Sequence, residues 1–160
     1  PPETMYYFQN ARALATIAKV LSLQVNDTVI AVLFRDADGS ASAERGNWQD
    51  KYDSMNHGFT VEQYEFGVAM IPNTKSEAWL LCAVKNDYQH CDNLEGIKGN
   101  DDSPNSLKSQ LATALNGKTS AIELAELVKD KAVDVERIDM NSFNQFRQDL
   151  QHAVKLALKH

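Results

Sequence analysis

Two aspartates stand two residues apart at the end of an apolar run, in the segment AVLFRDADGS at residues 31–40. Side chains two positions apart on an extended chain point to the same side, so Asp36 and Asp38 can converge on one ion. Oxygen ligands of this kind suit Mg²⁺ or Mn²⁺. The pair therefore predicts a divalent-metal site, and the alternative interpretation is an ordinary acidic turn built on Asp38 and Gly39.

A third carboxylate, Glu77, follows a second apolar run at residues 66–71. In open α/β sheets, ligands collect beyond the carboxyl ends of the parallel strands. If the two runs are neighbouring parallel strands, Asp36, Asp38 and Glu77 share one rim as a catalytic and metal-binding set. Because the helix dipole favours an acidic side chain near a helix start, a structural role for Glu77 is the alternative.

Two cations accompany these carboxylates. Arg35 directly precedes Asp36, and Lys75 lies two residues before Glu77. Either can contact a phosphate oxygen through a charge-assisted hydrogen bond. The alternative for both is a solvated surface charge.

Strands and helices alternate in the first half of the chain. Strands are predicted at 28–35 and 66–71, and the continuous apolar character of the first predicts that both of its faces are covered. Periodicity, capping residues and breakers predict the helices. Their predicted ranges are 4–22, 47–57, 76–84, a short one within 88–94, one from Ser103-Pro104 to about 115, 120–129, and one from Ser142 to the end.

Three of these helices carry predictions about individual residues. Leu14, Ile17, Ala18 and Leu21 form the predicted buried stripe of the first helix. In the second helix, Asn47 is the predicted cap and Gly58 the predicted end. In the last helix, the predicted apolar stripe is Phe143, Phe146, Leu150, Val154 and Leu158.

The pattern predicts an α/β fold in one domain, residues 1–160. Its α/β part with the metal site is predicted at 1–86, and a mainly helical part at 87–160.

The segments VIAVLFRDADGS, residues 29–40, and GVAMIPNTKSEAWLLCAV, residues 67–84, resemble a group of small Toprim-like proteins regarded as candidate metal-dependent nucleases. The resemblance implies an open, mostly parallel sheet flanked by helices, with a helical C-terminal part. It assigns Asp36 and Asp38 to the Asp-x-Asp pair of that family and makes Glu77 a site residue. It also implies a strand ending in glutamate ahead of the helix at 4–22, upstream of Pro1.

The resemblance implies a Mg²⁺- or Mn²⁺-dependent phosphodiester hydrolase that acts on nucleic acid, with a neighbouring ATPase as a partner protein. The formal net charge of −6 repels polyanions, so nucleic-acid binding by this chain alone should be weak. The apolar runs are too short to span a membrane. Cys82 and Cys91 are read as two reduced thiols of a cytoplasmic protein. The oligomeric state does not follow from the residues.

Two other functions compete for the same residues. The stretch Asp36–Ser40 also resembles the first motif of haloacid-dehalogenase-like phosphatases, in which the first aspartate is a nucleophile and the second a general acid/base. That family needs a later lysine and acidic pair, and Lys98 with Asp101 and Asp102 is the nearest set, but no apolar strand precedes Asp101. The other alternative is a non-catalytic regulatory partner of an ATPase.

Overall fold

The computed structural model describes residues 4–37, 47–84, 91–97 and 103–159. Helices dominate these ranges and two short strands form a parallel sheet, so the α/β class is confirmed in its broad form. The chain divides into two compact units. The first comprises Pro1–Ala37, Ala41–Ile71 and Gln145–His160, and the second Asp38–Ser40 and Pro72–Asn144. The prediction of one domain, with an α/β part up to residue 86 and a helical part after it, stays a prediction.

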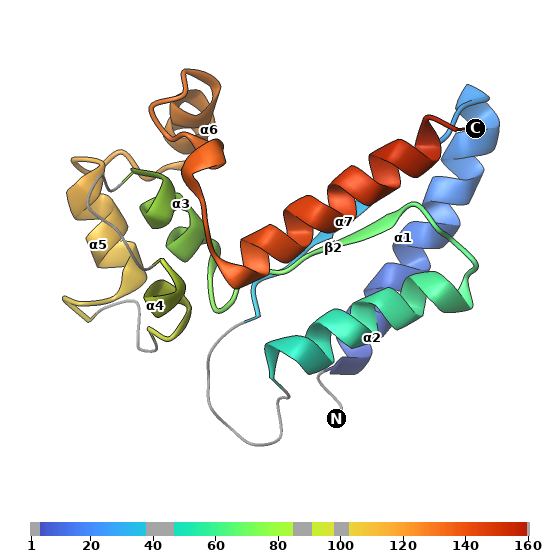
Figure 1. Cartoon of the computed structure of the whole chain (residues 1–160), viewed down its shortest axis with the longest axis horizontal. Helices are drawn as coiled ribbons and strands as arrows, with labels where there is room; N and C mark the ends of the chain where they lie inside the picture. Colours follow the sequence, from blue (N-terminus) through green and yellow to red (C-terminus); the bar gives the residue numbers. More distant parts are fainter. Residues whose placement is uncertain (1–3, 38–46, 85–90, 98–102, 160) are drawn as a thin grey trace. The chain divides into compact units, whose positions relative to one another are not determined.

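The described residues of the first unit form a two-stranded sheet and three helices (Figure 1). Its elements are α1 (Thr4–Val25), β1 (Ala31–Phe34), α2 (Trp48–Val61), β2 (Gly67–Met70) and the part of α7 (Asn141–Ala157) from Gln145 onward.

The two strands run parallel, with Ala31 opposite Gly67 and Phe34 opposite Met70. The backbone N–H of Ala31 donates to the Phe66 oxygen at 3.0 Å, and the N–H of Arg35 donates to the Met70 oxygen at 3.1 Å. The prediction of two strands within 28–35 and 66–71 is therefore confirmed. Their carboxyl ends lie at the same edge of the sheet.

Only one face of β1 is covered, so the prediction that both faces are buried is wrong. The core of the unit takes in Ala31, Leu33 and Ala69 together with side chains of α1 and α2. On the opposite face, Val68 of β2 is fully buried, whereas its partner Val32 on β1 is 41% exposed. Phe34 is 51% exposed on that same face. The cover on this face therefore stops at β2, and the apolar run of β1 reaches the surface.

The buried side of α1 is made of small residues rather than the predicted stripe. Ala11, Ala15 and Ala18 are at most 3% exposed, whereas Ile17 is 62% and Leu21 41% exposed. The physical reason is the neighbour: α1 crosses α2 at close range (Figure 1). Alanines permit that approach, and larger side chains at the crossing would hold the helices apart. Of the predicted stripe, Ala18 is confirmed as buried and Leu14 is half-buried.

Helix α2 begins as predicted but does not end at Gly58. The Asn47 side chain accepts the Asp50 N–H at 2.9 Å, and the Asp50 carboxylate accepts the Asn47 N–H at 3.2 Å, forming a capping box. The helix continues to Val61, with Gly58 in its interior. A Cβ atom at Gly58 would lie 2.4 Å from the Phe8 oxygen and 2.8 Å from the Ala11 Cβ. Gly58 is thus a packing residue of the α1–α2 crossing.

The second unit is built from short helices around its own core. They are α3 (Ser76–Val84), α4 (Asp92–Glu95), α5 (Leu107–Ala114), α6 (Ala121–Lys129), a 3₁₀ turn (Val135–Arg137) and the first residues of α7.

Local signals located these helices with mixed success. The capping box of Ser120 and Glu123 is present, and α6 ends at Lys129 as predicted. The predicted start of α5 at Ser103-Pro104 is wrong, because Ser106 caps it by accepting the Ser109 N–H at 3.1 Å. Residues 103–106 form a turn ahead of the helix.

The apolar stripe of α7 follows a different line from the predicted one. Ala153 is 2% exposed, whereas the predicted members Val154 and Leu158 are 38% and 82% exposed. A helix has 3.6 residues per turn, so positions spaced four apart move gradually around its surface and leave the buried face. A step of three residues, from Leu150 to Ala153, returns to that face.

Candidate functional site

Asp36 lies directly beyond the carboxyl end of β1. The Arg35 N–H still pairs with β2 at Met70, so Asp36 is the first residue past the ladder. Asp36 is half-buried. Because β1 and β2 are parallel and in register, this position lies at the sheet edge where α/β proteins collect ligands.

Two buried side chains hold the backbone at Asp36 and Ala37. The Tyr7 hydroxyl of α1 donates to the Asp36 carbonyl oxygen at 3.0 Å. The Lys51 ammonium of α2 donates to the Ala37 carbonyl oxygen. Tyr7 is 1% and Lys51 2% exposed, so both partners are themselves fixed by packing. The segment that carries Asp36 is therefore held by α1 and α2.

A third side chain holds the backbone directly after β2. The indole N–H of Trp48, the first residue of α2, donates to the Ile71 carbonyl oxygen at 2.7 Å. The chain is thus anchored beyond the carboxyl ends of both strands. Rigid backbone at this edge is what a preorganised ligand site requires.

The buried lysine was missed by the sequence reasoning, although a signal existed. Lys51 stands three residues after Trp48 and four before Met55, spacings that place all three side chains on one side of a helix. Its Nζ lies 5.9 Å from the Tyr7 ring centroid, a cation–π arrangement in a site with little water. Tyr7 was likewise not singled out, and no motif in the sequence marks it.

Arg35 is exposed and lies against two tyrosines. Its guanidinium carbon is 5.0 Å from the centre of the Tyr7 ring and 5.9 Å from that of Tyr6. Stacking on the rings limits the freedom of a long side chain while leaving its N–H donors to other partners. A phosphate-contacting role for Arg35 stays a prediction.

The remaining predicted site residues are distributed between the second unit and the chain outside the described ranges. Glu77 is half-buried in the first turn of α3, and Lys75 directly precedes that helix. Both belong to the second unit, whereas Asp36 belongs to the first, so their convergence stays a prediction. Asp38 lies outside the described residues, as do Lys98, Asp101 and Asp102. Within the described ranges, no group of three or more His, Cys, Asp or Glu side chains could hold a metal ion.

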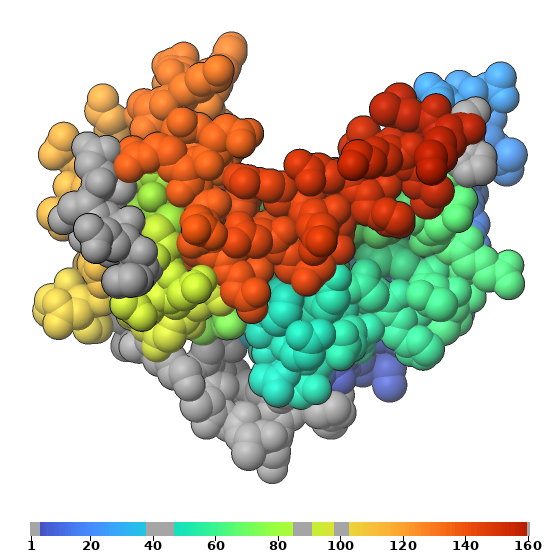
Figure 2. Space-filling view, in the orientation of Figure 1, coloured from blue at the N-terminus to red at the C-terminus, as the bar shows by residue number. Residues whose placement is uncertain are grey.

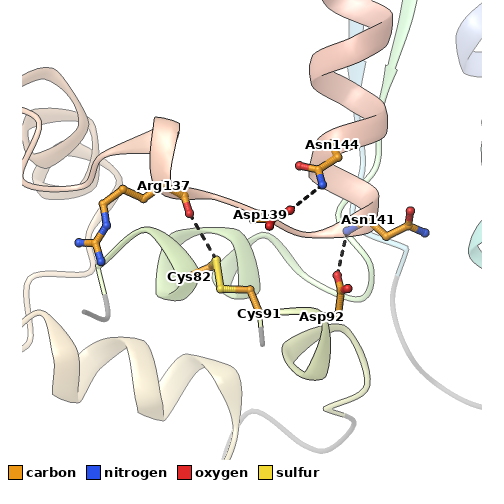
Figure 3. The surroundings of a disulfide bond; sticks show 7 residues. All are labelled: Cys82, Cys91, Asp92, Arg137, Asp139, Asn141 and Asn144. Atoms are coloured by element: carbon orange, nitrogen blue, oxygen red, sulfur yellow. Dashed lines mark hydrogen bonds between the residues drawn. A yellow bond between two sulfur atoms is a disulfide. The ribbon is translucent and has the colours of Figure 1, made fainter. Parts of the chain in front are cut away.

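Two other carboxylates, on α4, have a structural role that the sequence did not reveal. Asp92 accepts the Asn141 N–H at 3.1 Å, and Glu95 accepts the Ser142 N–H at 2.9 Å. They thereby satisfy donors of the first turn of α7. Figure 3 shows the bond between Asp92 and Asn141. Ser142 Oγ also donates to Glu95 at 3.0 Å and accepts the Trp79 indole N–H at 2.9 Å.

The two cysteines form a disulfide, which corrects the prediction of reduced thiols. Cys82 of α3 is bonded to Cys91, the residue before α4, and their Cα atoms are 5.8 Å apart. The Cys82 sulfur lies 3.9 Å from the Arg137 carbonyl oxygen, a contact drawn in Figure 3. Because a disulfide sulfur carries no proton, this is a packing contact. A zinc site or a thiol nucleophile built on these cysteines is incompatible with the bonded pair.

Comparisons of the chain with protein families, curated proteins and solved structures found no match. Within the described ranges, no helix combines the length and the apolar character that crossing a bilayer requires.

Proposed function

We propose that the chain is a Toprim-like, divalent-metal-dependent phosphodiester hydrolase that acts on nucleic acid. Asp36, Asp38 and Glu77 form its catalytic and metal-binding set in this proposal. The observation that carries it is the position of Asp36, directly beyond the carboxyl end of a parallel strand. Tyr7 and Lys51 hold the backbone of this segment in place. Ligand segments of metal sites need this kind of support.

The proposed roles follow from the chemistry of each group. Mg²⁺ or Mn²⁺ bound by the carboxylates would neutralise a phosphate and stabilise the leaving oxygen. Arg35, held against the Tyr6 and Tyr7 rings, is proposed to contact a phosphate oxygen, and so is Lys75. The net charge of −6 opposes binding to a polyanion. We therefore assign an ATPase-type partner protein to supply affinity.

The cytoplasmic location stays a prediction, and the disulfide weighs against it. Cytosolic reductants keep most protein thiols reduced, whereas disulfides persist in oxidising compartments. The Cys82–Cys91 bond is the feature of the described chain that bears on this point.

The test is nucleic-acid cleavage with a matched pair of variants. The chain is incubated with single- and double-stranded DNA and with RNA, each with Mg²⁺ or Mn²⁺. Asp36→Asn removes a carboxylate charge at the proposed site, and Asp130→Asn removes one at an exposed position after α6. We expect cleavage to fall by about 100-fold or more in Asp36→Asn alone, as for loss of a metal ligand.

Calorimetry with Mn²⁺ gives an independent readout. Metal uptake by the wild-type chain and by Asp130→Asn, with loss in Asp36→Asn, supports the proposal. Absence of both cleavage and metal uptake in the wild type contradicts it. Release of phosphate from small monoesters, without cleavage of nucleic acid, assigns the chain to the phosphatase alternative instead.

A further inference from the structure

Five apolar side chains of the first unit form a surface that we call the open-edge surface. They are Tyr6, Ile17 and Leu21 of α1 and Val32 and Phe34 of β1. Each is between 41% and 62% exposed. Apolar exposure of this extent on adjacent elements marks an interaction site more often than chance.

Packing places the α1 members on the same side of the unit as the outer edge of β1. Helix α1 contacts β1 and helix α2 contacts β2, so α1 lies beneath β1. Phe8 faces α2, where its ring stacks on His57 at 5.3 Å. Ile17 lies nine residues later, half a turn around the helix, and so on the flank away from α2. The contact of Arg35 with the Tyr6 ring, at 5.9 Å, ties that flank to the end of β1.

The outer edge of β1 also presents backbone groups that pair with none of the described residues. The N–H groups of Ala31 and Arg35 donate to β2, so alternation along the strand turns the N–H and C=O groups of Val32 and Phe34 outward. Among the described residues, β1 pairs with β2 alone. The strand Ala31–Phe34 contains no proline or charged residue, the usual protections of a free edge.

We propose that a second copy of this chain pairs with β1 across a two-fold axis, forming a continuous four-stranded sheet. The axis passes Leu33, so Val32 of one subunit lies opposite Phe34 of its partner, and the reverse. Both pairs are hydrogen-bonded pairs of an antiparallel ladder, which gives four backbone hydrogen bonds. The proposal is independent of the proposed nuclease function.

The segment is its own complement in this register, which favours a second copy over an unrelated strand. Each exposed valine meets an exposed phenylalanine, a favourable aromatic and β-branched pair on one face of the sheet. The α1 members of the open-edge surface from the two subunits approach each other on the opposite face. An interface in which the same patch serves both subunits is the usual form of a two-fold dimer.

The area is sufficient for a stable dimer. The five side chains, each about half exposed, contribute roughly 400 Å² of apolar surface per subunit. An interface that is about 60% apolar would then cover about 700 Å² per subunit. This value is close to the roughly 800 Å² per partner of stable specific complexes.

The first test is the mass of the chain in solution. Light scattering with size-exclusion chromatography should give a mass twice the 17.9 kDa of one chain. Phe34→Lys places a charge on the open edge, and Val32→Pro removes an outward N–H group without touching the bonds to β2. Each should weaken dimerisation by about 30-fold or more. Ile122→Lys, at a position of α6 that is 75% exposed, is the matched control and should leave the mass unchanged.

The second test fixes the register. Val32→Cys and Phe34→Cys chains are oxidised separately and as a mixture; the wild-type chain has no other free thiol. The proposed pair has Cα atoms about 5.5 Å apart, within reach of a disulfide, so the mixture should cross-link. Either variant alone should not, because like positions are offset by two residues along the strand.

The proposal is overturned by a wild-type chain that stays monomeric at about 1 mM, which leaves the open edge to a different strand. A dimer that survives Phe34→Lys, with far-ultraviolet circular dichroism unchanged, overturns it as well. Cross-linking of either variant alone overturns the register. None of these results depends on whether the chain cleaves nucleic acid.

Discussion

Gly58→Ala should destabilise the protein although alanine is the better helix former. Gly58 lies inside α2, where the change to alanine would gain about 1 kcal/mol from helix propensity alone. At the α1–α2 crossing, however, the added Cβ would lie 2.4 Å from the Phe8 backbone oxygen and 2.8 Å from the Ala11 Cβ. Backbone at such a contact can yield only if one helix moves.

The magnitude follows from these opposing effects. Overpacking of a filled interior costs about 1–3 kcal/mol, and a backbone contact below 3 Å belongs at the upper end. Subtracting the propensity gain leaves a net loss of about 2 kcal/mol in the free energy of unfolding. For a chain of this length, that loss corresponds to a fall of about 6 °C in Tm.

Urea denaturation followed by circular dichroism, together with a thermal scan, measures the effect. Gly96→Ala is the matched control, because the nearest atom of the described residues to a Cβ there is the Asn93 oxygen, at 3.6 Å. Its stability should stay equal or rise by about 0.5 kcal/mol. A Gly58→Ala chain as stable as wild type would refute the close crossing of α1 and α2.

Two further predictions concern single bonds. Burial first, and then the 2.5 Å hydrogen bond to Asp149 and its charge, raise the pKa of Tyr52 above its usual value near 10. The stabilisation of the folded chain by the neutral Tyr52 hydroxyl is complete below about pH 10. It is lost as pH rises further, because the tyrosine of the unfolded chain ionises first, so unfolding midpoints between about pH 9 and 11.5 should fall more steeply in wild type than in Tyr52→Phe. Equal slopes of midpoint against pH in the two chains would contradict this. The Cys82–Cys91 bond closes a loop with a sequence separation of 9, so replacing both cysteines by alanine should cost about 2–3 kcal/mol in urea denaturation. A reductant should lower the wild-type midpoint and leave the double variant unchanged, whereas an equal shift in both would show that the bond does not contribute.

The features predicted correctly from sequence are those that depend on residues close together in the chain. Asn47 caps α2 as predicted, and Ser120 and Glu123 form a capping box at the start of α6; both are short-range hydrogen-bond motifs. The two strands were recognised because β-rich apolar runs bounded by turn residues have few alternatives. Parallel pairing of the two strands, the condition for placing Asp36 at this edge, is observed, and α2 provides the crossover that such pairing needs.

The features that were missed depend on which neighbour an element meets. Periodicity placed Ile17 in the core because it is apolar, but the close crossing with α2 selects the alanines of α1. Gly58 was predicted to end the helix because glycine often stands at helix ends. Its packing role is revealed only by the proximity of the Phe8 backbone oxygen. Lys51 was passed over because a lysine normally reaches water.

The hydrogen bonds at the start of α7 have a consequence for the order of folding. Its first backbone donors are satisfied by Asp92 and Glu95, which lie 49 and 47 residues earlier in the chain than their partners. A peptide containing only this helix lacks both acceptors, and its first turn should fray. In the whole chain, that turn becomes stable only after the closure of a long loop, whose entropy cost must be met before these hydrogen bonds form.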